Sequence, residues 1–111
     1  MNAVKKDVEE LVVKELNSAN EQFPLFASLH EGYAVMLEEV EEVKEALESI
    51  DYYKVKLWEA IKQNIQVNAL TEAKIIKTLA THLACEAIQV AAMAEKMIVS
   101  ERKRNEKERH N

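Results

Sequence analysis

Residues that interrupt regular structure are rare in this chain, which has one glycine and one proline among 111 residues. Tight turns between strands use both residue types where special backbone angles are needed, so an all-β or α/β fold is nearly excluded. The single cysteine, Cys85, has no second cysteine with which to form an intramolecular disulfide. Apolar residues make up 48% of the chain and charged residues 32%, which is typical of amphipathic helices. We therefore expect an all-α helical bundle.

Long apolar runs and an excess of positive charge are also missing. No apolar stretch approaches the roughly 20 residues that cross a bilayer, and residues 1–20 carry charges throughout instead of a secretory signal. We expect a cytoplasmic protein without membrane contact. The net charge is −5, and residues 101–111 hold five Lys and Arg against three Glu, which leaves −7 on residues 1–100. Nucleic acid is therefore not an expected partner. We expect one helical domain over 1–100 and a charged helix end or tail over 101–111.

Hydrophobic periodicity predicts about four helices. Apolar residues recur at steps of three and four residues in 3–19, in 28–49, in 51–66, and from 71 into the charged tail. Pro24 separates the first two segments, because proline cannot continue a helix from the preceding turn. Ser28 is a predicted N-cap with Glu31 as its capping-box partner, and Asp51 and Thr71 are the predicted starts of the last two helices. We expect the second and last helices to be adjacent and antiparallel.

Glutamates on the second segment differ in their position around the helix. An apolar stripe is formed by Met36, Val40, Val43 and Leu47. The glutamates opposite this stripe, which we expect to be solvated, are Glu38, Glu41, Glu45 and Glu48. Glu39 and Glu42 instead lie one turn apart on the border of the apolar face. In the last segment, Glu86 and Gln89 have the same relation to an apolar stripe. Both helices therefore present the pattern E-x-x-[E/Q] at the edge of a buried face.

A metal site follows if these two helices are neighbours, because Glu39, Glu42, Glu86 and the amide oxygen of Gln89 then converge. Like charges gathered in a partly desolvated place are unstable alone, and a hard divalent cation with oxygen ligands relieves them. Magnesium is the expected ion, with manganese as a substitute. His82, four residues before Glu86, is expected to donate a hydrogen bond to that carboxylate rather than to bind the ion. The competing interpretation is that these are surface glutamates paired with Lys or Arg.

Two runs of this sequence resemble a known family. Residues 37–47, LEEVEEVKEAL, resemble the E-E-x-x-E helix of the MazG-like nucleoside triphosphate pyrophosphohydrolases, which are all-α, with Glu38, Glu39 and Glu42 on the motif positions. Residues 84–94, ACEAIQVAAMA, are similar to that family's E-x-x-D helix, with Glu86 on the glutamate. The similarity covers most of residues 4–98 and is to small MazG-like proteins of bacterial and phage genomes.

The resemblance implies magnesium-dependent hydrolysis of a nucleoside triphosphate to a monophosphate and pyrophosphate, in a homo-dimer or tetramer. Glu39, Glu42 and Glu86 would hold the magnesium, and Glu38 together with Glu39 would serve catalysis. Gln89 stands where the family has aspartate, which removes one negative charge and one strong ligand. Two functions therefore stay open: an active pyrophosphohydrolase with Gln89 as a neutral oxygen ligand, or a catalytically inactive protein of the same fold that acts by binding or assembly.

Overall fold

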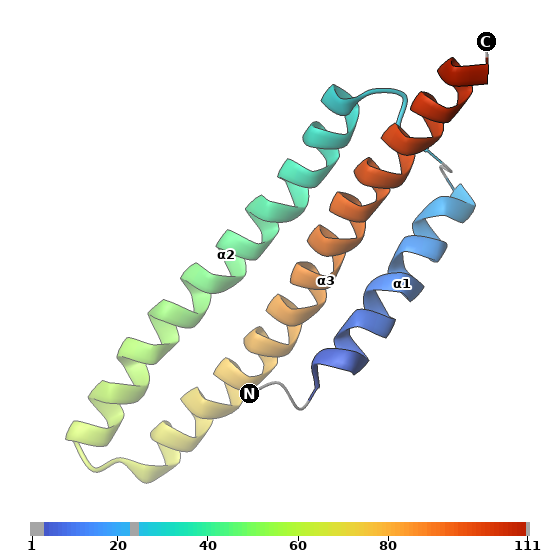
Figure 1. Cartoon of the computed structure of the whole chain (residues 1–111). Helices are drawn as coiled ribbons and strands as arrows, with labels where there is room; N and C mark the ends of the chain where they lie inside the picture. The colour runs from blue at the N-terminus through green and yellow to red at the C-terminus, as the bar shows by residue number, and fades with distance from the viewer. Residues whose placement is uncertain (1–3, 23–24, 111) are drawn as a thin grey trace. The chain divides into compact units, whose positions relative to one another are not determined.

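A computed structural model describes residues 4–22 and 25–110, which form three helices and no strand. These helices are α1 (Lys5–Gln22), α2 (Leu29–Lys62) and α3 (Gln66–His110), as Figure 1 shows. The all-α prediction is confirmed. Pro24, which predicts the break between the first two helices, lies outside the described residues. The chain divides into two compact units, one formed by Met1–Val40 with Ala87–Asn111 and the other by Glu41–Glu86.

The predicted helices 28–49 and 51–66 are a single helix of 34 residues, so three helices stand where the periodicity predicts four. Asp51 does not cap a new helix: its carboxylate lies 3.4 Å from the ammonium of Lys54, one turn ahead. The hydroxyl of Ser49 donates to the carbonyl of Glu45 at 3.2 Å, which leaves the helical backbone bonds intact. Neither glycine nor proline occurs near these residues, so nothing in the local sequence ends the helix here.

The end of α2 is set by Asn64, whose φ of 57° places it in the left-handed region. The N–H of Ile65 donates to the carbonyl of Ala60 at 3.0 Å, and the N–H of Asn64 donates to the carbonyl of Ile61 at 3.1 Å. These two bonds are the Schellman arrangement, which satisfies the last carbonyls of a helix. Helix α3 starts directly afterwards at Gln66, so Thr71 is not its first residue and instead donates its hydroxyl to the carbonyl of Val67.

In the unit Glu41–Glu86, the short turn after Lys62 makes a helical hairpin of the second part of α2 and the first part of α3 (Figure 1). The two segments run antiparallel, as expected for the second and last helices. Among the described residues of this unit, the buried hydrophobic ones are Ala46 and Ala60, both on α2. Small side chains allow close approach of two helices, but they bury little apolar surface.

In the other unit, a core forms from Phe26, Ala92 and Met93, with half-buried side chains packed around it from all three helices. These surrounding side chains are Val12, Leu16, Ala19, Val35, Met36 and Met97. Gly32 on α2 is buried against Met97 of α3 and Phe26 of the connector. A Cβ at this position would lie 2.6 Å from Cγ of Met97 and 3.1 Å from Cδ2 of Phe26, so glycine is required unless Met97 moves.

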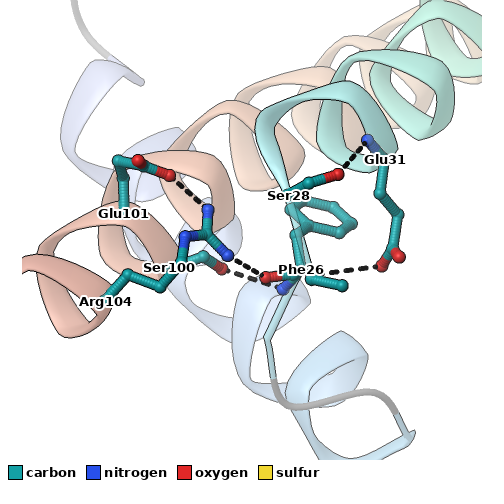
Figure 2. Close-up of polar contacts among 7 residues, drawn as sticks. Phe26, Ser28, Glu31, Ser100, Glu101 and Arg104 are labelled. Atoms are coloured by element: carbon teal, nitrogen blue, oxygen red, sulfur yellow. Dashed lines mark hydrogen bonds and ion pairs between the residues drawn. The ribbon is translucent and has the colours of Figure 1, made fainter. Parts of the chain in front are cut away.

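The connector before α2 is held in place by the distant end of α3 (Figure 2). The N–H of Phe26 donates to Oγ of Ser100 at 3.0 Å, and the guanidinium of Arg104 donates to the carbonyl of Phe26 at 2.7 Å. The predicted N-cap is confirmed, because Oγ of Ser28 accepts from the N–H of Glu31 at 3.1 Å. The Glu31 side chain reaches back to the N–H of Ala27 at 3.4 Å, one residue before the cap.

Helix α3 is 45 residues long and continues through the charged segment as far as His110. Within this segment, Arg104 also pairs with Glu101 one turn earlier, which orients its guanidinium toward the connector (Figure 2). Over the described residues, none of the three helices combines the length and the apolar character that a membrane crossing requires.

Substitution of Asn64 tests the Schellman turn. Because a β-branched side chain fits the left-handed region poorly, Asn64→Val is expected to lower the free energy of unfolding by about 1–2 kcal/mol, and Asn64→Gly is expected to be tolerated. Urea denaturation followed by circular dichroism measures both changes. The matched control is Asn68→Val in the first turn of α3. This change should alter the free energy of unfolding by only a few tenths of a kcal/mol, through the difference in helix propensity. Equal losses in the two valine variants would contradict the assignment.

Candidate metal centre

Three glutamates from two helices form an acidic group. Glu42 on α2 and Glu86 on α3 offer carboxylate oxygens within 4.8 Å of each other, and Glu39, one helical turn before Glu42 in the continuous helix α2, completes the group. These are the three carboxylates that the border pattern of the sequence predicts as ligands. The helical period accounts for Glu39 and Glu42, which lie three residues apart on one side of α2.

Burial is uneven within the group. Glu86 is only 8% exposed, whereas Glu39 is half-buried and Glu42 is exposed. Glu86 is buried because it lies on the side of α3 that faces α2 in the helical hairpin. Ala46 of α2, also buried, leaves room beside it because alanine ends at Cβ. One carboxylate is therefore withdrawn from water while Glu42 stays accessible to an entering ion.

A cavity of about 500 Å³ lies against this pair, inside the unit Glu41–Glu86. Its lining residues come from one side of each helix and are Glu42, Glu45, Ala46, Ser49, Leu79, His82 and Glu86. Glu45 is exposed, as the sequence predicts, but it also lines the cavity, a role that the sequence analysis does not assign to it. The signal was available in the sequence, because Glu45 and Ser49 lie three and seven residues after Glu42 and so share its side of the helix.

His82 is placed as the spacing predicts. Its Nε2 lies 3.5 Å from Oε1 of Glu86, one turn further along α3, and its side chain is 61% exposed. The imidazole N–H of a histidine in this position can donate a hydrogen bond to one oxygen of the Glu86 carboxylate. Such a bond orients the carboxylate and leaves its other oxygen for a ligand in the cavity. Its assignment to an orienting role stays a prediction.

Two further residues predicted for the site, Glu38 and Gln89, are not among the three glutamates of the acidic group. Glu38 is exposed and is not one of the three members of the acidic group, so its catalytic assignment rests on the resemblance alone. Gln89 is half-buried one turn beyond Glu86 on α3. Its place as a fourth ligand stays a prediction.

The donor set fits a small hard cation. All three members offer carboxylate oxygens, the ligand type that Mg²⁺ and Mn²⁺ prefer over nitrogen or sulfur. Two oxygens bound to one Mg²⁺ at roughly 2.1 Å lie at most about 4.2 Å apart, and the observed separations are at most 4.8 Å. Glu42 is exposed and Glu39 is half-buried, so a change in the torsions of these two side chains can close such a difference. Cys85, on the same helix, is exposed and is not part of the group.

Comparison of the chain with protein-family models, with curated proteins and with solved structures finds no match.

Removal of one ligand tests the centre. Magnesium at ten times its dissociation constant stabilises a native-state site by about 1.4 kcal/mol, which for a chain of this size raises the melting temperature by roughly 4–8 °C. Glu42→Gln should abolish this rise. Without magnesium the variant should be at least as stable as the native protein, because one of three crowded negative charges is gone. Thermal melting with and without millimolar magnesium measures both effects.

The matched control is Glu41→Gln, which removes an exposed charge at the neighbouring position, where Glu41 pairs with Lys44 at 3.5 Å. This variant should keep the full magnesium effect. If Glu41→Gln and Glu42→Gln respond alike, the ion binds elsewhere on this acidic chain.

Proposed function

We propose that the protein is a magnesium-dependent nucleoside triphosphate pyrophosphohydrolase of the MazG-like type, acting on nucleotides of the cytoplasm. The observation that carries the proposal is the group Glu39, Glu42 and Glu86 beside a cavity of about 500 Å³. That volume falls within the roughly 300–1,000 Å³ of small-molecule sites. The two runs of residues that resemble the family's motif helices are the ones that carry these three glutamates.

Charge supports a requirement for metal. Among the described residues that line the cavity, three are glutamates and none is lysine or arginine. A triphosphate is repelled by such a surface unless cations lie between the phosphates and the carboxylates. Magnesium, when bound, supplies this neutralisation and lowers the pKa of a coordinated water, which favours attack on phosphorus.

The residues of the chain have distinct tasks in this proposal. Glu42 and Glu86 hold the ion from the two helices, and Glu39 holds it from the preceding turn of α2. We assign catalysis to Glu39 rather than to Glu38, because Glu39 belongs to the acidic group. His82 positions the Glu86 carboxylate through its 3.5 Å contact. Gln89 offers a neutral amide oxygen, which weakens metal binding relative to an aspartate and leaves the helix geometry unchanged.

The second candidate is a catalytically inactive helical protein with this fold, which acts by binding or assembly. Gln89 is the residue that favours it, because the family that the sequence resembles has an aspartate there. Metal binding and turnover separate the two candidates.

We propose self-association for both candidate functions. In the unit Glu41–Glu86, Leu47, Trp58 and Ile61 of α2 are 49%, 57% and 49% exposed. Their separations of 11 and 3 residues bring them to one side of the helix. On α3, separations of 7 and 4 residues likewise bring three exposed small residues to one side of the helix, where they permit close approach of another helix: Ala73, Ala80 and Ala84. A two-helix hairpin cannot cover these faces by itself, so we propose that a second copy of the chain packs on them.

Turnover should depend on the ligand set. Native protein with magnesium should release pyrophosphate from at least one member of a panel of nucleoside triphosphates, measured by a coupled pyrophosphate assay. Loss of an outer-shell partner of a metal costs about 10- to 100-fold in activity, so Glu86→Gln, which removes a direct ligand, should cost at least as much. Glu41→Gln should retain native turnover.

Gln89→Asp distinguishes the two candidates. Under the enzyme proposal it should strengthen magnesium binding and raise pyrophosphate release, because it adds a charged ligand. Turnover absent from both the native protein and Gln89→Asp would favour the inactive helical protein. Turnover that is high in the native protein and falls in Gln89→Asp would show that the amide itself contacts substrate, and the ligand assignment would be wrong.

Oligomer mass provides a separate check. Multi-angle light scattering at micromolar concentration should give a dimer or a tetramer. Trp58→Glu should shift it toward monomer, because loss of a central aromatic anchor costs about 2 kcal/mol or more, a factor of roughly 30 in affinity. Tyr33→Glu, which changes an exposed aromatic residue in the other unit, is the control. A native protein that is monomeric at this concentration would contradict the proposal.

A further inference from the structure

A second cavity, of about 450 Å³, lies in the unit formed by Met1–Val40 and Ala87–Asn111. Its lining comes from the end of α1, the connector, the start of α2 and the second part of α3, and consists of Ala19, Gln22, Leu25, Phe26, Glu31, Val35, Met93 and Lys96. None of these residues belongs to the acidic group or lines its cavity. The lining is mostly apolar and includes one ammonium and one carboxylate.

Lys96 is the exceptional member, because it is only 4% exposed. Its burial lowers the pKa of the ammonium from the usual lysine value, and the negative charge of Glu31 opposes this shift. Nζ lies 4.8 Å from the centre of the Phe26 ring, where the electron-rich face attracts a cation. A desolvated ammonium beside an apolar cavity gains from any further negative charge that enters the cavity.

Part of the cavity wall is held by hydrogen bonds within the chain. The backbone of Phe26 is held at both its N–H and its carbonyl, by Ser100 at 3.0 Å and Arg104 at 2.7 Å (Figure 2). Glu31 is held by its bond to the N–H of Ala27 (Figure 2). A preorganised wall reduces the ordering cost of binding, which matters most for small ligands.

We propose that this cavity binds a small amphipathic monocarboxylate, whose carboxylate accepts hydrogen bonds from Nζ of Lys96 and whose hydrocarbon chain lies against Leu25, Val35 and Met93. The charge pattern selects this class. Lys96 is buried whereas Glu31 is exposed to water, so the ammonium acts more strongly than the carboxylate on a group inside the cavity, and an anion is favoured over an amine. The charge of Glu31 opposes each added negative charge, so a monoanion is favoured over a phosphate monoester. The apolar lining disfavours a small ion without a hydrocarbon body. This site is independent of the proposed hydrolase activity.

Three ligands of equal chain length and different head groups test the proposal: octanoate, octanol and octylamine. Isothermal titration calorimetry of the full chain should give octanoate an affinity at least tenfold above that of octanol, and octylamine should not bind. Lys96→Met keeps most of the volume of the lysine stem and removes the charge, so it should bind octanoate and octanol equally. Lys96→Arg should retain the preference for octanoate in part, because the positive charge remains.

The matched control is Lys103→Met, which removes an exposed charge further along α3 and should bind octanoate as the native protein does. Circular dichroism and melting of Lys96→Met establish that it is folded. Octanoate affinity equal to that of octanol in the native protein, or unchanged in Lys96→Met, would overturn the proposal. So would the absence of any octanoate binding at millimolar concentration. Because the acidic group is untouched in Lys96→Met, its magnesium-dependent melting reports separately on the metal centre.

Discussion

The inward position of Glu86 is the constraint on which the acidic site depends. A carboxylate that is only 8% exposed must receive compensation from hydrogen bonds or from a positive charge. His82 is 3.5 Å away on the same helix, and the carboxylates of Glu42 and Glu86 approach within 4.8 Å. Ala46 makes this geometry possible, because a larger residue there would fill the space beside the buried carboxylate. Two carboxylates held this close offer oxygen ligands from two helices to a single cation.

Buried charge of the opposite sign occurs in the other unit. Lys96 is almost entirely withdrawn from solvent, with the face of Phe26 and the charge of Glu31 nearby. Among the described residues, each unit therefore places a buried ionisable side chain beside a cavity, and the chemistry of these two cavities differs. The first is lined by carboxylates, the ligand type that a hard cation prefers. The second is largely apolar with an ammonium, and suits an organic anion.

Stability is distributed unequally between the units. The unit containing α1 has a core of Phe26, Ala92 and Met93, and its connector is tied to α3 by Ser100 and Arg104. The helical hairpin Glu41–Glu86 buries two alanines as its hydrophobic residues and leaves Leu47, Trp58 and Ile61 exposed. Apolar burial supplies most of the free energy of folding. In the proposed self-association, the hairpin is thus the part of the chain that would gain most from a second copy.

The sequence alone determined what depends on neighbours within one or two helical turns. The scarcity of glycine and proline indicated helices, Ser28 with Glu31 predicted the start of α2, and the E-x-x-E spacing placed Glu39 and Glu42 on one side of that helix. Tertiary structure decided the rest, because one-dimensional periodicity does not say which faces meet. Asp51 has the chemistry of an N-cap, yet the helix runs through it, and the actual break uses the left-handed Asn64. Glu45 and Ser49 line the cavity only because α3 returns beside them. Phe26 is held by partners 74 and 78 residues away, a separation over which local sequence carries no information.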